Sequence, residues 1–398
     1  MEAADLPFRG VNVVDVTEGA QGPFAASLLA ELGASVLKIE RPGGEMMRRG
    51  YGRPQKRGAP LPILSIARGR AASVELDLAS PPGRDELLRL VRLADVFIEN
   101  WKPGTASALG LSYEELTREN AGLIYLSASG FGPAGPFAHL GSRGHITAAS
   151  GGLASVSGAL EELPEHPRIA LLDFISAMVT GEMAIAAIVL TKGTGRGVHA
   201  ETSQLESAIA GVAPVLTAVD SGTDPFGGGP GGASDRWVVP SSIFPCAAGG
   251  YAAIHAETDA QWRALTSVLN IQEEPAWETA EGRWRDAAGV EARIAEATRD
   301  QDAEALTTRL HAEGVPASVV RRFVGDALND RKLSDEHVAW RHAGDSVGWI
   351  ALAQPPWKFS QCDVRAAWPC PPLGAAVAQK WPEEWQRNAD ELASRGSG

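Results

Sequence analysis

The sequence has few cysteines and no excess of basic residues, and each shortage removes a class of protein. Its 398 residues include three cysteines, Cys246, Cys362 and Cys370, with no C-x-x-C pair. Thiols in this pattern build neither a disulfide framework nor a zinc site, so we expect a reducing compartment and buried or inert cysteines. The net charge of -13 argues against nucleic-acid and anionic-membrane partners, because both favour a clustered basic surface.

Membrane-directing segments are also missing from the sequence. The first residues, MEAADLPFRGVNVVDV, have no basic stretch followed by an apolar one, and no run approaches about 18 uninterrupted apolar residues. We therefore expect a cytoplasmic protein without a membrane partner. The 44% of hydrophobic residues provides enough apolar material for a large core.

Three common catalytic signatures do not occur. The turn TEGAQGP supplies Gly19 and Gly22 but no G-x-G-x-x-G, and Pro23 occupies the expected helix start, which disfavours nicotinamide or flavin binding. The segment SASGFG at 127–132 lacks the G-x-S-x-G pattern of serine hydrolases. The histidines are scattered without metal-ligand spacing, so we predict no metal site.

The first half of the chain alternates between strands and helices. Strands are expected at VNVVDV, SVLKIE, SVELDL, VFIEN, LIYLSAS and GVHAETS, and helices such as GPFAASLLAELGA and PPGRDELLRLVRLA separate them. A long apolar helix, AMVTGEMAIAAIVLTKGTG, precedes the last strand. Near-continuous apolar strands between helices indicate a parallel sheet covered on both faces. The predicted fold class is α/β, with a Rossmann-like parallel sheet in a large domain.

The composition changes abruptly at 221–236, SGTDPFGGGPGGASDR, where the glycine density predicts a loop or linker. Beyond it, SSIFPC and YAAIHA are typical of a hairpin, and three helices and a strand near ASVV complete an α+β pattern. The Pro- and Trp-rich tail from about residue 345 predicts irregular packing over another domain. The predicted domains are a large α/β domain over 1–220, a small α+β domain over 221–335, and a return segment over 336–398 that packs on the large domain.

A single carboxylate interrupts the apolar stretch RIALLDFISAMVTG. Asp173 stands there between Leu172 and Phe174, and burying a carboxylate without a partner is costly. One interpretation is a cap for the following helix, worth about 1 kcal/mol. The other interpretation is a catalytic group.

Several long blocks resemble the class III CoA transferases, a superfamily that includes formyl-CoA and carnitine CoA-transferases and the 2-methylacyl-CoA racemases. The blocks are QGPFAASLLAELGASVLKIERPGGEMMRRG, SVELDLASPPGRDELLRLVRLADVFIENWKPGTASALGLSYEEL, SASGFGPAGP, FPCAAGGYAAIHAETDAQWRAL and EGVPASVV. The resemblance covers nearly the whole chain. It implies an enzyme that moves CoA from an acyl-CoA donor to a carboxylic acid acceptor, without a tightly bound cofactor. It also implies a ring-shaped chain in an interlocked homodimer.

In this family an aspartate near a helix start, after the GFGPAGP block, is the catalytic carboxylate, and Asp173 occupies that place. The resemblance implies that it attacks the donor thioester to form a mixed anhydride. CoA thiolate then forms an aspartyl-CoA thioester, which the acceptor acid resolves. Gly227, Gly228 and Gly229 stand where some members carry a mobile loop that closes over the aspartate, and a plain interdomain linker is the alternative.

The resemblance also implies a CoA site. Its residues are Gly19 and Ala20 of the first turn, Arg41 of ERPG, and Asn100, Trp101 and Lys102 of ENWKPG. Arg41 and Lys102 suit the phosphates, whereas Trp101 packs either on adenine or in the core. The family often has a basic residue near Ala108, which this chain lacks, and the candidates to replace it are Arg48, Arg68 and Arg143.

Two alternatives stay open at this stage. Racemases of the superfamily pair the aspartate with a histidine and exchange the α-proton of an acyl-CoA through an enolate, which implies His145 and Asp173 here. His145 lies too close to the following Ser-Gly and lacks the next Asp, and five methionines are few for the Met-lined acyl sites of those racemases. The second alternative is a non-catalytic CoA-binding homologue, which the retained Asp173 disfavours.

Overall fold

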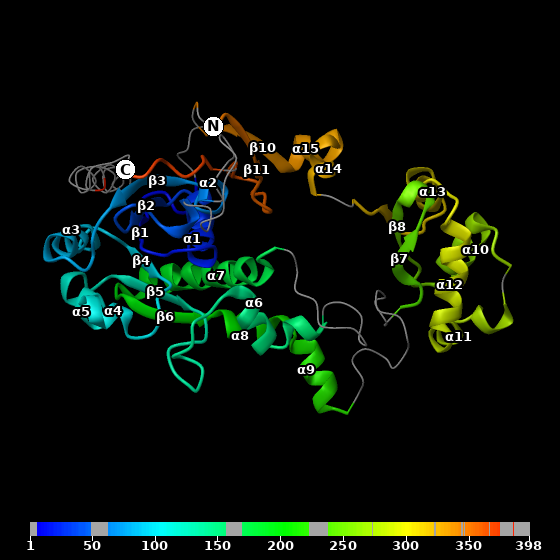
Figure 1. The fold of residues 1–398 in the computed structure, drawn as a ribbon, viewed down its shortest axis with the longest axis horizontal. Helices are drawn as coiled ribbons and strands as arrows, with labels where there is room; N and C mark the ends of the chain where they lie inside the picture. The colour runs from blue at the N-terminus through cyan, green and yellow to red at the C-terminus, as the bar shows by residue number, and fades with distance from the viewer. Residues whose placement is uncertain are drawn as a thin grey trace. The chain divides into compact units, whose positions relative to one another are not determined.

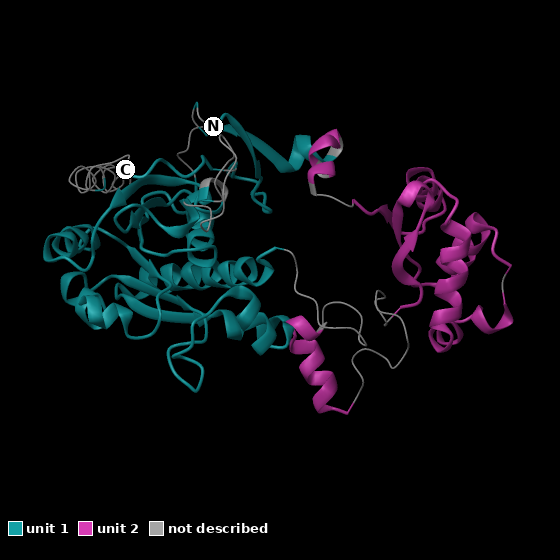
Figure 2. Cartoon of the chain, in the orientation of Figure 1, with its two compact units in different colours: residues 1–153, 167–211, 332–398 teal, residues 154–166, 212–331 magenta. Residues whose placement is uncertain are grey.

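The chain forms two compact units. The computed structural model describes residues 6–48, 63–156, 169–222 and 238–374, apart from 273, 322, 323, 344, 346 and 366, together with residue 385. One unit comprises residues 1–153, 167–211 and 332–398, and the other residues 154–166 and 212–331 (Figure 2). The predicted domain limits at residues 220 and 335 stay a prediction.

The first unit is built on a six-stranded sheet with the order β3-β2-β1-β4-β5-β6 (Figure 1). Each strand pairs in parallel with its neighbours, as the sequence predicts. The strands are β1 (Asn12–Asp15), β2 (Ser35–Glu40), β3 (Arg70–Glu75), β4 (Val96–Glu99), β5 (Ile124–Ser129) and β6 (Val198–Ser203). This order is that of a doubly wound α/β fold, in which the direction of strand addition reverses between β1 and β4.

Strand β3 begins three residues before the expected segment SVELDL. The prediction missed its start because Arg70 is not a typical residue for a buried strand. In the structure the Arg70 side chain is buried and ion-paired with Asp15 of β1, at 2.8 Å. The ion pair compensates for the burial of the guanidinium group, so a charged residue can begin an interior-facing strand.

Helices cover both faces of the sheet. On one face, α1 (Gln21–Glu31) and α7 (Leu171–Thr194) pack with strand residues that include Val13. On the other face, α3 (Pro81–Val91) and α5 (Tyr113–Glu119) pack with the alternate strand residues, Val14 among them. Each fully buried Val or Leu contributes roughly 1.5–3 kcal/mol relative to exposure. The shorter helices of the same unit are α2 (Ile63–Ile66), α4 (Thr105–Leu109), α6 (Gly144–Ser150) and α8 (Gln204–Gly211).

Helix α7 is long and apolar enough, by length and composition, to cross a membrane, and it is the one helix among the described residues that meets this test. Its inner face packs on α1 and on the sheet, with Ala177, Ala184 and Ile188 in the core. The core helix of a soluble protein meets the same test, so this feature is weak evidence for a membrane span.

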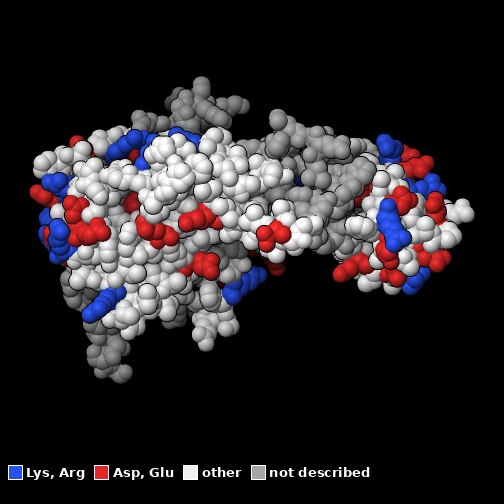
Figure 3. All heavy atoms as spheres, turned by 90° about the horizontal axis from the view of Figure 1, so that it is seen from below, with Lys and Arg blue, Asp and Glu red and all other residues white. Residues whose placement is uncertain are grey.

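Figure 3 shows the distribution of charge on one face of the molecule. Broad uncharged areas there separate small groups of acidic side chains.

The C-terminal part of the chain returns to the first unit. It is more regular than predicted, because β10 (Val338–His342) and β11 (Trp349–Ala353) form an antiparallel hairpin, whereas the sequence predicted an irregular tail from about residue 345. The alternation that buries Ile350 and Leu352 explains this hairpin. Farther along, the Trp368 carbonyl accepts a hydrogen bond from the Gly69 N–H, and Trp385 Nε1 donates to Ser35 Oγ.

The second unit has α+β character, and its hairpin is confirmed. Strands β7 (Ser241–Pro245), β8 (Tyr251–His255) and β9 (Ala317–Val319) form an antiparallel sheet. The buried core includes Trp262, Leu306 and Cys246. The helices placed in this unit are α9 (Ala213–Asp220), α10 (Asp259–Leu269), α11 (Ala280–Arg285), α12 (Ala287–Thr298), α13 (Ala303–Ala312) and α14 (Val324–Asn329), and α15 (Arg331–His337) begins at its boundary.

Candidate active site

The turn after β1 meets the turn after β4 at the carboxyl edge of the sheet. The Asn100 side chain accepts a hydrogen bond from the Glu18 N–H at 2.9 Å and donates one to the Glu18 carbonyl at 2.7 Å. Gly19 follows with a φ of 79°, and Ala20 is the N-cap of α1. In doubly wound sheets, ligands bind at this reversal point. The structure therefore brings Gly19, Ala20 and Asn100 together where a ligand is expected.

Three of the predicted cations lie at segments near this edge. Arg41, directly after β2, is half exposed and ion-paired with Glu18 at 3.2 Å. Arg143 Nη1 lies 3.7 Å from the sulfur of Met46, in the segment that continues from Arg41. Lys102 is exposed in the turn after β4. Arg143 therefore contacts the segment after β2 that also carries Arg41.

Arg48 and Arg68, two other candidates to replace the missing basic residue, already form ion pairs with glutamates. Arg48 is ion-paired with Glu40 at 2.6 Å, with 12% of its side chain exposed. Arg68 is buried and ion-paired with Glu31, also at 2.6 Å. Binding a phosphate with either of them would break a buried ion pair, which is costly. Arg143 is the exposed member of the three candidates.

Trp101 has contacts that favour core packing. It is half-buried, and its ring lies 6.3 Å from that of Phe97, which is fully buried in β4. Trp101 also lines a cavity of about 210 Å³, together with Lys102, Ser127 and Glu201. Asp173 does not line this cavity, so the cavity and the candidate catalytic carboxylate are separate features of the structure.

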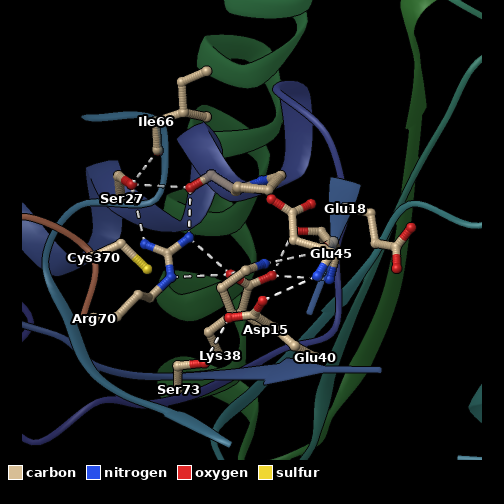
Figure 4. Close-up of polar contacts among 12 residues, drawn as sticks. Asp15, Glu18, Ser27, Lys38, Glu40, Glu45, Ile66, Arg70, Ser73 and Cys370 are labelled. Carbon is tan, nitrogen blue, oxygen red and sulfur yellow. Dashed lines mark hydrogen bonds and ion pairs between the residues drawn. The ribbon is translucent and has the colours of Figure 1, made fainter. Parts of the chain in front are cut away.

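A buried polar network contacts the turn after β1, which is called the first turn below (Figure 4). Asp15 is fully buried, pairs with Arg70 at 2.8 Å and lies 3.8 Å from Lys38 Nζ. It also accepts hydrogen bonds from the backbone and hydroxyl of Thr17. Burial by itself raises the pKa of a carboxyl group, but Lys38, Arg70 and Thr17 outweigh it and hold the pKa of Asp15 below its usual value.

Glu45 is the second support of this turn. Its Oε2 accepts the Gly19 N–H at 2.8 Å, and the side chain is fully buried. Lys38 Nζ donates to the Thr17 carbonyl at 2.9 Å. Burial raises the pKa of Glu45, although Lys38 and the Gly19 hydrogen bond offset part of this effect. The network thus fixes the backbone from Thr17 to Gly19 before any ligand arrives.

Asp173 lies in the first turn of α7 and is half-buried. The N-cap of this helix is Ala170, so the interpretation of Asp173 as the cap is wrong. A sequence cannot separate these two positions, because Asp is favoured both at the cap and in the first turn. The helix dipole stabilises an ionised carboxylate at this position.

Gln204 and Gly144 both lie against the Asp173 carboxylate. Gln204, directly after β6, donates from Nε2 to Asp173 Oδ1 at 2.7 Å. The Gln204 Oε1 in turn accepts from Thr147 Oγ1 at 3.0 Å. Oδ2 lies against the backbone of Gly144, where an added Cβ would be only 2.3 Å away. Neither Gln204 nor Gly144 was expected from the sequence.

Helices α1 and α7 place Asp173 at the same end of the sheet as the first turn. The Phe24 and Phe174 rings meet edge to face at 4.9 Å, and farther along Leu28 lies against Gly181. The two helices therefore run side by side in the same direction, and their starts coincide. Arg143 precedes Gly144, so one segment touches both Asp173 and the Met46 region.

The remaining predicted residues divide into two groups. His145 is exposed and follows Gly144 on α6, so the structure places both members of the racemase alternative in one neighbourhood. Gly227, Gly228 and Gly229 lie outside the described residues, and their role stays a prediction. Among the residues that the structure describes, no group of three or more His, Cys, Asp and Glu side chains could hold a metal ion.

This combination of features occurs in proteins of known structure. The sheet is doubly wound, a buried network supports the turn at its reversal point, and a carboxylate lies at the start of a neighbouring helix. The structure matches a CAIB/BAIF family protein from Brucella suis with a TM-score of 0.83, at 26% identity over 96% of this chain and 100% of that one. The CoA-transferase family III model matches residues 8–377, and the chain belongs to this family. The predicted resemblance and enzyme class are confirmed.

Similar proteins with assigned reactions cover most of the chain. The succinyl-CoA--D-citramalate CoA-transferase of Chloroflexus aurantiacus is 30% identical over 97% of this chain and 96% of its own length. The succinate--glutarate CoA-transferase of Agrobacterium fabrum is 28% identical over 94% of each chain. The alpha subunit of a succinyl-CoA--L-malate CoA-transferase from Chloroflexus aurantiacus is 35% identical over 67% of this chain and 62% of the subunit.

Proposed function

We propose that this enzyme transfers CoA from succinyl-CoA to a second carboxylic acid, with Asp173 as the nucleophile. The observation that carries the proposal is the half-buried Asp173 at the start of α7, held by Gln204 at 2.7 Å. The relatives support the substrate class, because those named above act on succinyl-CoA or succinate and a dicarboxylic acid. The identity of the acceptor is the finer part of the proposal.

The proposed reaction proceeds through covalent intermediates on Asp173. A carboxylate oxygen attacks the thioester carbonyl of the donor, which gives a mixed anhydride and CoA thiolate. The thiolate then attacks Cγ of Asp173, releases the donor acid and forms an aspartyl-CoA thioester. The acceptor carboxylate reverses both steps, and acyl-CoA of the acceptor leaves. Each step regenerates one carbonyl and one anionic leaving group, so no external oxidant or reductant is required.

The first turn and its neighbours are the proposed CoA site. Gly19 and Ala20 allow close approach at the sheet edge, and Asn100 fixes their turn through Glu18. Arg41, Lys102 and Arg143 would supply the positive charge that an acidic protein must provide locally for phosphates. Trp101 would contribute a half-buried aromatic wall beside them.

We further propose that two copies of the chain interlock to form the working enzyme. Helix α7 exposes a stripe of large apolar side chains, Leu171, Met178, Ile185 and Val189, which are 38% to 65% exposed. Such a stripe beside Asp173 suits a partner surface. Sedimentation is expected to give twice 41.8 kDa for the purified chain. A monomer at micromolar concentration would contradict this, and so would activity that depends on a second, different subunit.

Two assays, one with and one without an acceptor acid, distinguish CoA transfer from racemisation. Succinyl-CoA with a panel of dicarboxylic acids should give new acyl-CoA products that require both substrates. A 2-methylacyl-CoA in heavy water without acceptor should show no deuterium at the α-carbon above the enzyme-free background. Deuterium uptake that is lost in both His145→Ala and Asp173→Ala would favour the racemase and overturn the proposal.

A further inference from the structure

Gln204 lies at the junction of β6 and α8 and donates a hydrogen bond to the Asp173 carboxylate. It is the first residue of α8, directly after β6, and only 4% of it is exposed. Its Nε2 lies 2.7 Å from Asp173 Oδ1, a short distance for an amide donor and typical of a hydrogen bond to a charged group. Glutamine side chains carry considerable conformational entropy, so an ordered and buried one requires compensating contacts.

The orientation of the Gln204 amide follows from its two partners. An ionised carboxylate only accepts hydrogen bonds, so the amide NH2 group must face Asp173. The carbonyl Oε1 then faces Thr147, whose hydroxyl is 3.0 Å away and can donate. Thr147 is fully buried in α6, so the partner on that side is held as firmly as the amide itself. The donor is therefore aimed at Oδ1 before the reaction begins.

We propose that Gln204 is a catalytic residue that stabilises negative charge on Oδ1 of Asp173. The inference rests on the proposed function, in which Cγ of Asp173 is attacked after the anhydride has formed. In this proposal Oδ2 attacks the donor, and Oδ1, which accepts the Gln204 hydrogen bond, becomes the carbonyl oxygen of the aspartyl group. This assignment makes Gln204 the donor at the oxygen where charge develops.

The electron balance of the step shows where the donor acts. The CoA thiolate sulfur forms a bond to Cγ, and the pair of electrons of the C=O π bond moves to Oδ1. When this pair returns, the bond from Cγ to the bridging oxygen breaks and the donor acid leaves as a carboxylate. The acceptor step uses the same oxygen, because its carboxylate adds to Cγ of the thioester and thiolate is expelled. Gln204 therefore stabilises the charge on Oδ1 both when the thiolate attacks Cγ and when the acceptor carboxylate attacks Cγ. It exchanges no proton in either step.

The expected effect is large because the donor is fixed in advance. Removal of one preorganised donor to a developing oxyanion lowers kcat by about 100-fold to 1000-fold. Attack of Asp173 on the donor thioester places its charge on a different oxygen, so loss of Gln204 should slow the second step more than the first. The anhydride then persists longer, and water intercepts it more often.

The test compares Gln204→Met with the wild type, using succinyl-CoA and a dicarboxylic acid that the wild type accepts. Methionine has a similar length and no donor. We expect kcat for transfer to fall by about 100-fold, KM for succinyl-CoA to stay within about threefold, and the ratio of hydrolysis to transfer to rise. A transfer rate within threefold of the wild type at an unchanged ratio would overturn the inference.

Thr147→Val is the second variant and keeps the test decisive if Gln204→Met does not fold. It leaves the Gln204 donor in place but removes the hydroxyl that orients it, so a smaller loss of kcat and the same rise in the hydrolysis ratio are expected. An unchanged ratio in a folded Thr147→Val protein would count against the inference.

Asp173→Ala separates the inference about Gln204 from the proposed function. If it retains transfer, the proposed function is wrong, whereas an inactive Asp173→Ala beside a normal Gln204→Met rejects only the role of Gln204.

Discussion

Gly144 and Asp173 meet so closely that no side chain fits between them. An alanine Cβ at Gly144 would lie 2.3 Å from Oδ2 of Asp173, well below any ordinary contact distance. The glycine is therefore a steric requirement of the carboxylate position. It is not a conformational requirement, since the φ of Gly144 is not positive.

The first prediction is that Gly144→Ala displaces the carboxylate and lowers kcat. A shift of about 1 Å in a reacting group can cost about 100-fold in rate, and we expect a loss of this size in kcat. Gly193→Ala in α7 is the matched control, because its Cβ would meet nothing within 4 Å. The control should retain full activity. Equal activity of the two variants would show that Gly144 is not required.

The second prediction concerns the phosphates of CoA. Arg41→Ala removes a half-exposed guanidinium group whose partner in the free protein is Glu18. We expect KM for succinyl-CoA to rise about tenfold with little change in kcat, because a charge-assisted contact is lost equally from substrate and transition state. Steady-state kinetics at low and high salt measure this effect. A change confined to kcat would place Arg41 outside the CoA site.

The third prediction tests the network beneath the first turn. Asp15→Asn leaves Arg70 and Lys38 buried beside a neutral group, and breaking a buried pair in this way costs about 3–5 kcal/mol. Urea unfolding gives the free energy directly. The control is Glu296→Gln, which removes an exposed pair with Arg293 and should cost less than about 0.5 kcal/mol. Similar losses in both variants would refute the role given to the network.

The fourth prediction follows from the raised pKa of Glu45. Below the usual value of 4.5, Glu45 is protonated in both the folded and the unfolded chain. As pH rises past that value, the unfolded chain releases the proton first, so the wild type loses stability relative to Glu45→Gln until the folded pKa is passed. Urea unfolding of both proteins from pH 4.5 to 7.5 should show a gap that widens in favour of the variant. A gap independent of pH would contradict the shift.

The sheet could be predicted from the sequence, whereas the contacts around Asp173 could not. Parallel strands buried on both faces have a continuous apolar pattern, so five of the six strands were placed within a residue or two, and β3 was misplaced because Arg70 is polar. Gly144 and Gln204 left no comparable signal. Their importance arises from tertiary proximity to Asp173, although a polar Gln directly after the last parallel strand marks the carboxyl edge where such groups gather.

The most direct test of the account is the mass of the peptide that contains Asp173 after the enzyme is mixed with succinyl-CoA and quenched. We expect an adduct of CoA or succinyl mass on this peptide. Hydroxylamine should remove it, and Asp173→Ala should not form it although its far-UV spectrum is unchanged. An unmodified Asp173 peptide in an enzyme that transfers CoA at the normal rate, or a hydroxylamine-sensitive adduct on another residue, would contradict the central claim that Asp173 is the nucleophile.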